Sequence, residues 1–199
     1  MEKIFEQDNF ITIEECKTLI RYQEKNSPND VSKGFWDSRI VRSYDESIKD
    51  LTNTIHQRII NSCIEFYEEE NIYLEFTNLV YWGVGMKLEA HADNFWIDDP
   101  QKPHYSSNRD YSSVLYLNDD FTGGETYFRD YNYSITPKPG KLIIFTSGAK
   151  HIHGVKEILS GKRYTMATWY TKNINHKMLD NPPQMPYNTQ VINRRPHEN

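Results

Sequence analysis

The stretch Tyr81-Trp-Gly-Val-Gly-Met-Lys-Leu-Glu-Ala-His-Ala-Asp93 decides the fold when it is combined with a second stretch, Phe145 to Trp169. The first stretch holds His91 and Asp93, and residues two apart project to the same side of an extended chain. The second stretch holds His153. A histidine arriving from this distant strand would complete two imidazoles and one carboxylate on one side of a metal. That donor set leaves open positions on an octahedral ion and suits non-haem Fe(II).

Bulk composition indicates one domain with a substantial core. The chain has 199 residues, of which 37% are hydrophobic and 14% aromatic, and a net charge of −5. The negative charge argues against a broad nucleic-acid-binding face.

No apolar run reaches the about 18 residues of a membrane span, and the first residues lack the pattern of a signal peptide. Cys16 and Cys63 allow one bridge, but two reduced cysteines fit better. We therefore expect a cytoplasmic protein without a membrane partner.

The N-terminal part of the chain, to about residue 70, predicts two helices. The first runs from Ile13 to about Lys25, with Thr12 and Glu15 at the spacing of a capping box. The second runs from about 46 to about 70, where apolar residues recur at intervals of three and four. We expect these helices to act as a buttress for the rest of the domain.

After residue 71 the pattern changes to strands rich in Val, Ile, Thr and aromatic residues. The predicted strands are 73–76, 79–81, 112–117, 126–128, 141–145 and 164–170. Turn residues separate them and no convincing helix interrupts them, so an antiparallel sandwich or barrel is favoured over a βαβ sheet. The expected organisation is a single domain over 1–171, with its β-barrel core at about 71–171, followed by an irregular tail over 172–199.

A polar segment, 94–110, follows directly after Asp93 and contains Trp96 and Tyr105. A long loop in this place suits a mobile lid over a site, but an ordinary surface loop fits the sequence equally well. We therefore expect His91, Asp93 and this segment to lie at one end of the predicted barrel.

Six ordered pieces of sequence carry a resemblance to a known family. They are Tyr81-X3-Gly85-X5-His91-X-Asp93, Ser113-Val-Leu-Tyr-Leu-Asn118, Phe121-X-Gly123-Gly-Glu-Thr-X-Phe128, Pro139-Gly-Lys-Leu-Ile-Ile-Phe145, His153-Gly-Val-X-X-Ile-X-X-Gly161-X-Arg163-Tyr164 and the closing Trp169. Over about residues 5–171 the chain resembles the Fe(II)- and 2-oxoglutarate-dependent oxygenases, in particular their prolyl 4-hydroxylase-like branch. This resemblance implies a mainly β fold, a double-stranded β-helix or jelly-roll, cupin-like barrel, with N-terminal helices.

The resemblance also implies roles for single residues. His91, Asp93 and His153 match the metal ligands, although His151 lies two residues before His153 and also qualifies. The ten-residue spacing to Arg163 and the following Gly-Val favour His153. Arg163 matches the cation that binds the far carboxylate of 2-oxoglutarate, where a guanidinium offers paired donors. Collagen-type members have Lys at that position.

Two further residues are candidates for the cosubstrate pocket. Tyr116 matches a family tyrosine that donates its hydroxyl to the same carboxylate, and a packed core tyrosine fits nearly as well. Thr126 is a weaker candidate for the same pocket. Trp96 and Tyr105 are the candidate lid and substrate residues, since aromatic side chains can hold an extended proline-bearing segment.

The implied reaction uses Fe(II), 2-oxoglutarate and O2, with ascorbate as reductant, and releases succinate and CO2. Because related halogenases replace the carboxylate, Asp93 favours hydroxylation. Our first interpretation of the substrate is a prolyl residue in a peptide or protein, followed by a free amino acid or another small molecule. No nucleic-acid partner is expected, since the demethylating branch carries a second arginine where this chain has Trp169. A metal-binding β-barrel without turnover is the interpretation from another class.

Overall fold

The computed structural model describes residues 3–28, 34–42 and 44–178. Its helices, in the described ranges, are α1 (Ile13–Asn26), α2 (Gly34–Asp37) and α3 (Lys49–Tyr67), with short 3-10 turns at Arg129–Tyr131, Ala149–His151 and Ile174–His176. None of these helices combines the length and the apolar character needed to cross a bilayer. Most of the predicted tail, from residue 179 onward, lies outside the described residues.

The first helix begins as its sequence predicts. The Thr12 hydroxyl accepts a hydrogen bond from the Glu15 amide, and the Glu15 carboxylate accepts one from the Thr12 amide, which completes the capping box. Apolar side chains of α1 and α3, among them Leu19, Ile55 and Ile59, are buried against one face of the larger sheet. The two predicted helices are confirmed, and the second is slightly shorter than expected.

The strands form three hydrogen-bonded groups in the described part of the chain. A six-stranded sheet has the order β1-β9-β5-β12-β3-β2, a four-stranded sheet the order β4-β10-β7-β8, and β11 pairs with β6. All pairings are antiparallel. The strands are β1 (Phe5–Gln7), β2 (Ile40–Val41), β3 (Tyr73–Trp82), β4 (Leu88–His91), β5 (Tyr111–Tyr116), β6 (Phe121–Gly123), β7 (Thr126–Phe128), β8 (Tyr133–Ile135), β9 (Leu142–Thr146), β10 (His153–Val155), β11 (Ile158–Gly161) and β12 (Arg163–Thr171).

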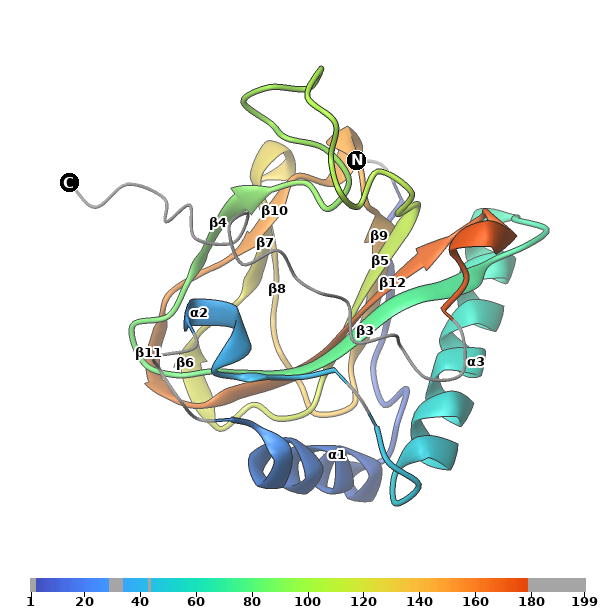
Figure 1. The fold of residues 1–199 in the computed structure, drawn as a ribbon. Coiled ribbons are helices and arrows are strands. Elements are labelled where there is room, and N and C mark those ends of the chain that lie inside the picture. The colour runs from blue at the N-terminus through green and yellow to red at the C-terminus, as the bar shows by residue number, and fades with distance from the viewer. Residues whose placement is uncertain (1–2, 29–33, 43, 179–199) are drawn as a thin grey trace.

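The two larger sheets curve around a common interior, and α1 and α3 lie outside the six-stranded sheet (Figure 1). The mainly β architecture with helices on one side is as predicted. The strands are not joined by hydrogen bonds into one closed barrel within the described residues, because the two larger sheets remain separate groups.

Alternation along β12 separates the two sides of the larger sheet. Met166 and Tyr170 point into the core beneath the helices, whereas Arg163 and Thr165 line the interior cavity. This is the period of two that a strand imposes on its side chains. The same strand therefore supplies both the hydrophobic core and the cavity wall.

Two of the differences from the predicted strands concern β3 and β4. The predicted strands 73–76 and 79–81 form one strand, β3, because Thr77 and Asn78 between them pair in register with β12. The strand β4, which carries His91, was not predicted. Its sequence is poor in β-branched residues, and it is held by pairing with β10.

Candidate active site

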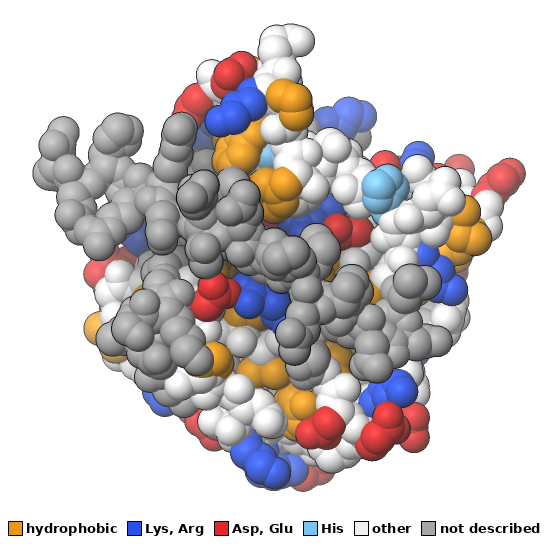
Figure 2. All heavy atoms as spheres, viewed as in Figure 1, with side chains coloured by type: hydrophobic (Ala, Val, Ile, Leu, Met, Phe, Trp, Pro, Cys, Tyr) orange, Lys and Arg blue, Asp and Glu red, His pale blue; other side chains and the backbone are white. Residues whose placement is uncertain are grey.

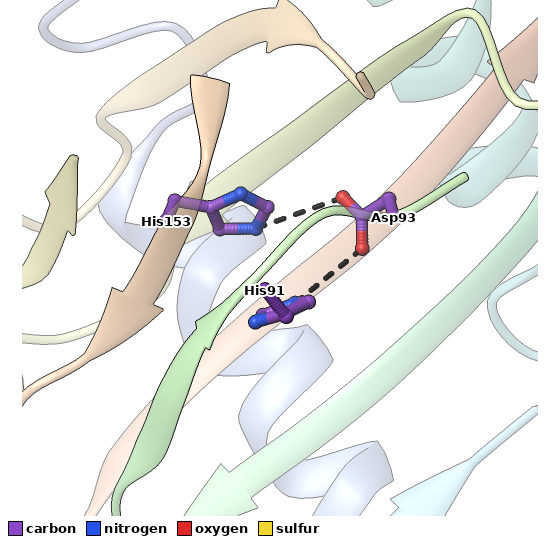
Figure 3. Close-up of side chains that lie close together, drawn as sticks. All are labelled: His91, Asp93 and His153. Atoms are coloured by element: carbon purple, nitrogen blue, oxygen red, sulfur yellow. Dashed lines mark ion pairs between the residues drawn. The ribbon is translucent and has the colours of Figure 1, made fainter. Parts of the chain in front are cut away.

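His91, Asp93 and His153 meet at one end of the four-stranded sheet. His91 is the last residue of β4 and pairs directly with His153, the first residue of β10. Asp93 follows β4 by two residues, and both imidazoles point toward its carboxylate (Figure 3). Nε2 of His91 lies 3.5 Å from Oδ1 of Asp93, and Nε2 of His153 lies 3.6 Å from Oδ2. One ligand atom from each residue falls within 4.8 Å of the others, an arrangement that can hold a metal ion.

Backbone carbonyls orient both imidazoles. Nδ1 of His91 lies 3.0 Å from the Glu89 carbonyl oxygen, and Nδ1 of His153 lies 2.9 Å from the His151 carbonyl oxygen. A carbonyl only accepts, so each neutral ring carries its proton on Nδ1 and presents the lone pair of Nε2 to the centre of the group. Such hydrogen bonds on the outer nitrogen are typical of metal-binding histidines.

The Asp93 carboxylate is buried and held from several directions. Burial works to raise its pKa, but His153 and His91 beside it lower the pKa of Asp93 well below its usual range. The Ser112 hydroxyl donates a 2.6 Å hydrogen bond to Oδ2, and the Ser147 hydroxyl lies 2.7 Å from that of Ser112. Asp93 is therefore an ionised carboxylate whose orientation is fixed by its surroundings.

The two imidazoles respond differently to this environment. Burial lowers the pKa of His153 to about 4, which keeps its ring neutral near pH 7. Burial also opposes the charge on His91, but the hydrogen bond and charge of Asp93 raise its pKa. Metal binding requires both rings to be neutral, so it would release the proton that Asp93 favours on His91.

His151, the other histidine considered for this position, lies elsewhere. Its Nδ1 is 2.7 Å from the Thr146 hydroxyl, and its ring packs among the rings of Phe128, Tyr131 and Phe145. It is not among the three side chains whose ligand atoms converge. The structure thus groups His153 with His91 and Asp93, while His151 contributes its backbone carbonyl.

Arg163 is a buried cation in the wall of the interior and is 2% exposed. Its amino groups lie 3.2 Å from the Thr126 hydroxyl and 3.4 Å from that of Thr165, and Tyr116 donates a 2.6 Å hydrogen bond to Thr126. Nε of Arg163 has no hydrogen-bond partner, and no acidic side chain of the described ranges pairs with the guanidinium. Burial lowers the pKa of Arg163, yet an arginine stays charged near neutral pH. The pocket therefore contains a buried cation that can accept an anion.

One cavity of about 470 Å³ connects these groups. Its wall includes the three converging side chains, Arg163 and Thr126, and it also takes residues from both larger sheets. Tyr116 lies beneath the wall, with the Arg163 guanidinium 5.1 Å from its ring centre. The volume falls within the range of about 300–1,000 Å³ that small-molecule sites occupy.

Residues of the segment 94–110 line this cavity, and the segment projects beyond the strands in Figure 1. Trp96, His104 and Tyr105 line the cavity and contact one another, with ring centres 4.5 Å apart for Trp96–His104 and 4.4 Å apart for His104–Tyr105. Tyr105 is 65% exposed, and hydrophobic side chains gather on the projecting loop in Figure 2. The two predicted lid residues are thus placed at the opening.

The base of this segment is tied together. The Asn94 side chain donates a 2.8 Å hydrogen bond to the Arg109 carbonyl. Ser147 accepts from the Asp93 amide and donates its own amide to the Asp110 carbonyl, at 2.9 Å each. The two ends of the segment are therefore fixed beside Asp93, whatever the position of the tip.

Several cavity residues were not predicted. Arg109 forms a 3.0 Å ion pair with Glu75, and its guanidinium lies 4.2 Å from the ring of Trp169. Nothing in the local sequence of Arg109 marks it as a cavity residue. Ser112 had a usable signal, because it shares its face of β5 with Tyr116, four residues on.

Comparisons with known proteins agree with this geometry. Residues 76–171 match the family model of the 2OG-Fe(II) oxygenase superfamily. Prolyl 3-hydroxylase 2 of Homo sapiens is 26% identical over 212 residues, which cover 87% of this chain and 30% of that protein. Prolyl 3-hydroxylase 3 of Homo sapiens is 33% identical over 131 residues, 56% of this chain and 18% of that protein. The chain thus spans under a third of the length of these relatives.

Solved structures give the fold. The viral collagen prolyl hydroxylase of Paramecium bursaria Chlorella virus-1, in its 2OG complex, superposes with a TM-score of 0.65 at 18% identity, covering 85% of this chain and 96% of that one. A prolyl hydroxylase of Trichoplax adhaerens, in complex with a peptide fragment of the hypoxia inducible factor oxygen degradation domain, gives 0.62 at 18% identity, with 85% and 83% covered. The jelly-roll fold predicted from the sequence is confirmed. Residues 76–171 of this chain belong to the 2OG-Fe(II) oxygenase superfamily.

Proposed function

We propose that the chain is an Fe(II)- and 2-oxoglutarate-dependent dioxygenase that hydroxylates a prolyl residue in a peptide or protein. The observation that carries this proposal is the convergence of His91, Asp93 and His153 in the same cavity as the buried cation Arg163. A metal site and an anion site in one cavity are what a reaction with a metal-bound keto acid requires.

The three converging side chains fit Fe(II). Two imidazoles and one carboxylate on one side of an ion are the ligand set of non-haem Fe(II) oxygenases, and they leave positions for other ligands. Both imidazoles already present Nε2, and the carboxylate is held ionised. We propose His91, Asp93 and His153 as the iron ligands.

Arg163 fits the far carboxylate of 2-oxoglutarate. An unpaired buried guanidinium is costly, and an arriving carboxylate would supply the missing charge and a partner for the free Nε. The Tyr116 and Thr126 hydroxyls are hydrogen-bonded to each other beside it. In our proposal they orient the carboxylate, with Tyr116 neutral because burial raises its pKa.

The bound groups carry the oxidation itself. Fe(II) with 2-oxoglutarate and O2 supplies the chemistry in which the cosubstrate becomes succinate and CO2 and a C–H bond of the substrate becomes C–OH. The residues of the chain hold these groups in register: Asp93 and the two histidines on one side, Arg163 on the other. The segment 94–110 limits the access of water at the mouth.

A prolyl peptide is supported by two sets of relatives. Those found by sequence are named prolyl 3-hydroxylases, and one similar structure is a prolyl hydroxylase with a bound peptide fragment. In this chain Trp96 and Tyr105 offer aromatic surface at the cavity mouth, where we propose that they contact an extended proline-bearing segment. The sequence relatives are named for hydroxylation at C3, whereas the sequence motifs resemble the prolyl 4-hydroxylase-like branch, so the hydroxylated carbon is a matter for product analysis.

The test is hydroxylation of a proline-rich peptide by the purified chain given Fe(II), 2-oxoglutarate and ascorbate as reductant. Mass spectrometry should show a gain of one oxygen per target proline, and NMR of the product distinguishes C3 from C4. An unmodified peptide together with succinate formation would move the substrate to free amino acids or other small molecules, which a cavity of about 470 Å³ also admits. If neither hydroxylated peptide nor succinate forms, the proposal that the chain is an enzyme of this kind is overturned.

A further inference from the structure

We infer that Ser112 and Ser147 form a hydroxyl relay that positions Asp93 so that its Oδ1 is the oxygen offered to the metal. The inference rests on the proposed metal site and adds two positioning residues to it. Both serines are buried, at 2% and 0% exposure. Neither side chain contacts the histidines through a hydrogen bond within the described residues, so any effect on the metal passes through Asp93.

The direction of the hydrogen bonds follows from the groups involved. An ionised carboxylate can only accept, so the 2.6 Å contact between Ser112 Oγ and Asp93 Oδ2 uses the Ser112 proton. That proton is then unavailable for the 2.7 Å contact with Ser147. Ser147 must therefore donate to Ser112. The relay runs from Ser147 to Ser112 to Asp93, and each hydrogen bond polarises the next.

The relay makes the two carboxylate oxygens unequal. Oδ2 receives the charge-assisted hydrogen bond from Ser112, which is of the strong kind. Oδ1 receives no hydroxyl hydrogen bond within the described residues, and it faces Nε2 of His91 at 3.5 Å. The lone pairs of Oδ1 remain available, so the geometry favours coordination through this single oxygen.

The relay also compensates for the position of Asp93 in the chain. Asp93 lies beyond the end of β4, at the start of the long segment 94–110. Ser112 lies in the middle of the six-stranded sheet, opposite Phe145 on one side and Trp169 on the other. The backbone carbonyl of Ser147 also accepts a hydrogen bond from the Asp93 amide. A ligand on a loop is thus tethered to the rigid sheet, which preorganises a metal site.

The test is binding of Mn(II) alone to the full chain, measured by the loss of the EPR signal of free Mn(II). We expect Ser112→Ala to weaken Mn(II) affinity by about 10- to 100-fold, the usual cost of losing a partner that orients a metal ligand. Ser147→Ala should give a smaller loss in the same direction. Ser112→Thr keeps the hydroxyl and should restore affinity to within a few-fold of the wild type.

Ser113→Ala is the matched control, because Ser113 is an equally buried neighbour whose hydroxyl lies 3.5 Å from the Thr168 carbonyl and not beside Asp93. It should bind Mn(II) as the wild type does. Thermal unfolding without metal identifies any variant that fails to fold. Equal affinities for Ser112→Ala and Ser113→Ala would overturn the relay and leave the proposed function standing. A wild-type chain that fails to bind Mn(II) would overturn the metal site and the relay together.

Discussion

The two faces of the six-stranded sheet differ sharply in what they bury. On the helix-covered face, side chains such as Leu115, Leu142 and Met166 are fully buried and apolar. On the cavity face, the same strands present Arg163 and Ser112, which are buried and polar. Adjacent residues of one strand thus serve opposite purposes. We conclude that the helix face provides the stability and that the cavity face uses it to hold charged groups in place.

The largest effect is expected for Asp93→Ala on the cavity face, which should abolish metal binding and turnover while the protein stays folded. Asp93→Ala removes a proposed ligand directly, so the loss should exceed the about 100-fold cost of removing an outer partner. We expect Mn(II) binding and succinate formation to fall below detection. The free energy of unfolding should fall only modestly, by about 1–3 kcal/mol, because the buried Ser112 hydroxyl loses its acceptor. Retention of metal-dependent turnover would contradict the role proposed for Asp93.

The opposite result, a loss of stability without a loss of cosubstrate binding, is expected for a substitution on the helix face, three residues from Arg163. Met166→Ala removes a fully buried side chain from the core beneath the helices. It should lower the free energy of unfolding by about 2–5 kcal/mol, as measured by urea denaturation. The Michaelis constant for 2-oxoglutarate should be unchanged in the folded protein. A raised constant with little loss of stability would show that the two faces are not independent.

A substitution of Arg163 tests the proposed binding site for the far carboxylate of 2-oxoglutarate. Arg163→Met keeps the length of the side chain and removes the guanidinium. Loss of a charged hydrogen-bonding partner worth about 1.5–3 kcal/mol should raise the Michaelis constant for 2-oxoglutarate by about 10- to 150-fold. The free energy of unfolding of the metal-free chain should be unchanged or increased, since no acidic residue of the described ranges is left unpaired. An unchanged Michaelis constant would place the cosubstrate elsewhere.

The helix face has a polar exception that makes stability depend on pH. His56 of α3 is buried, its Nε2 lies 3.2 Å from the Thr77 hydroxyl, and burial lowers its pKa to about 4. The unfolded chain takes up this proton near pH 6.5 and the folded chain only near its lowered pKa. Stability from this group is therefore complete above about pH 6.5 and lost as the pH falls, by about 2 kcal/mol between pH 7 and pH 5.

The control for this prediction is His56→Gln, because other histidines also titrate in this range. Urea unfolding of both chains at several pH values should give a steeper fall for the wild type. Parallel curves would show that His56 is not responsible.

The smallest expected effect concerns the cavity mouth. Tyr105 is largely exposed, and Tyr105→Ala should raise the Michaelis constant for a proline-rich peptide only a few-fold, through loss of aromatic contact worth about 1 kcal/mol. Succinate formation without peptide should not change. Ile174, which is 61% exposed and is not among the cavity-lining residues, offers a matched control in Ile174→Ala. Equal effects of Tyr105→Ala and Ile174→Ala on the Michaelis constant would contradict the proposal that Tyr105 contacts the peptide.

The sequence predicted the parts of the molecule that depend on local pattern. The capped helix α1 follows from residue spacing alone, and spacing also placed His91 and Asp93 on one side. The strand β4 escaped prediction because pairing with β10, not its own residues, makes it a strand.

Other features depend on contacts between distant segments. The aromatic packing of the His151 ring, which holds it away from Asp93, and the Arg109–Glu75 ion pair, which joins residues 34 apart, both depend on tertiary contacts. Separate hydrogen-bonded sheets in place of one closed barrel are likewise a property of the assembled strands. Local sequence carries no signal for the ion pair or for the separate sheets, whereas the spacing to Arg163 and the following Gly-Val already favoured His153.

The most direct test of the central claim is the stoichiometry of the reaction on a proline-rich peptide. Succinate and hydroxylated peptide should form in equal amounts with the wild-type chain, and both should be lost with Asp93→Ala. Equal amounts in the wild type would show that one cavity brings metal, cosubstrate and peptide together, as the account predicts. Metal-dependent peptide modification that persists without 2-oxoglutarate, or in the Asp93→Ala chain, would contradict it.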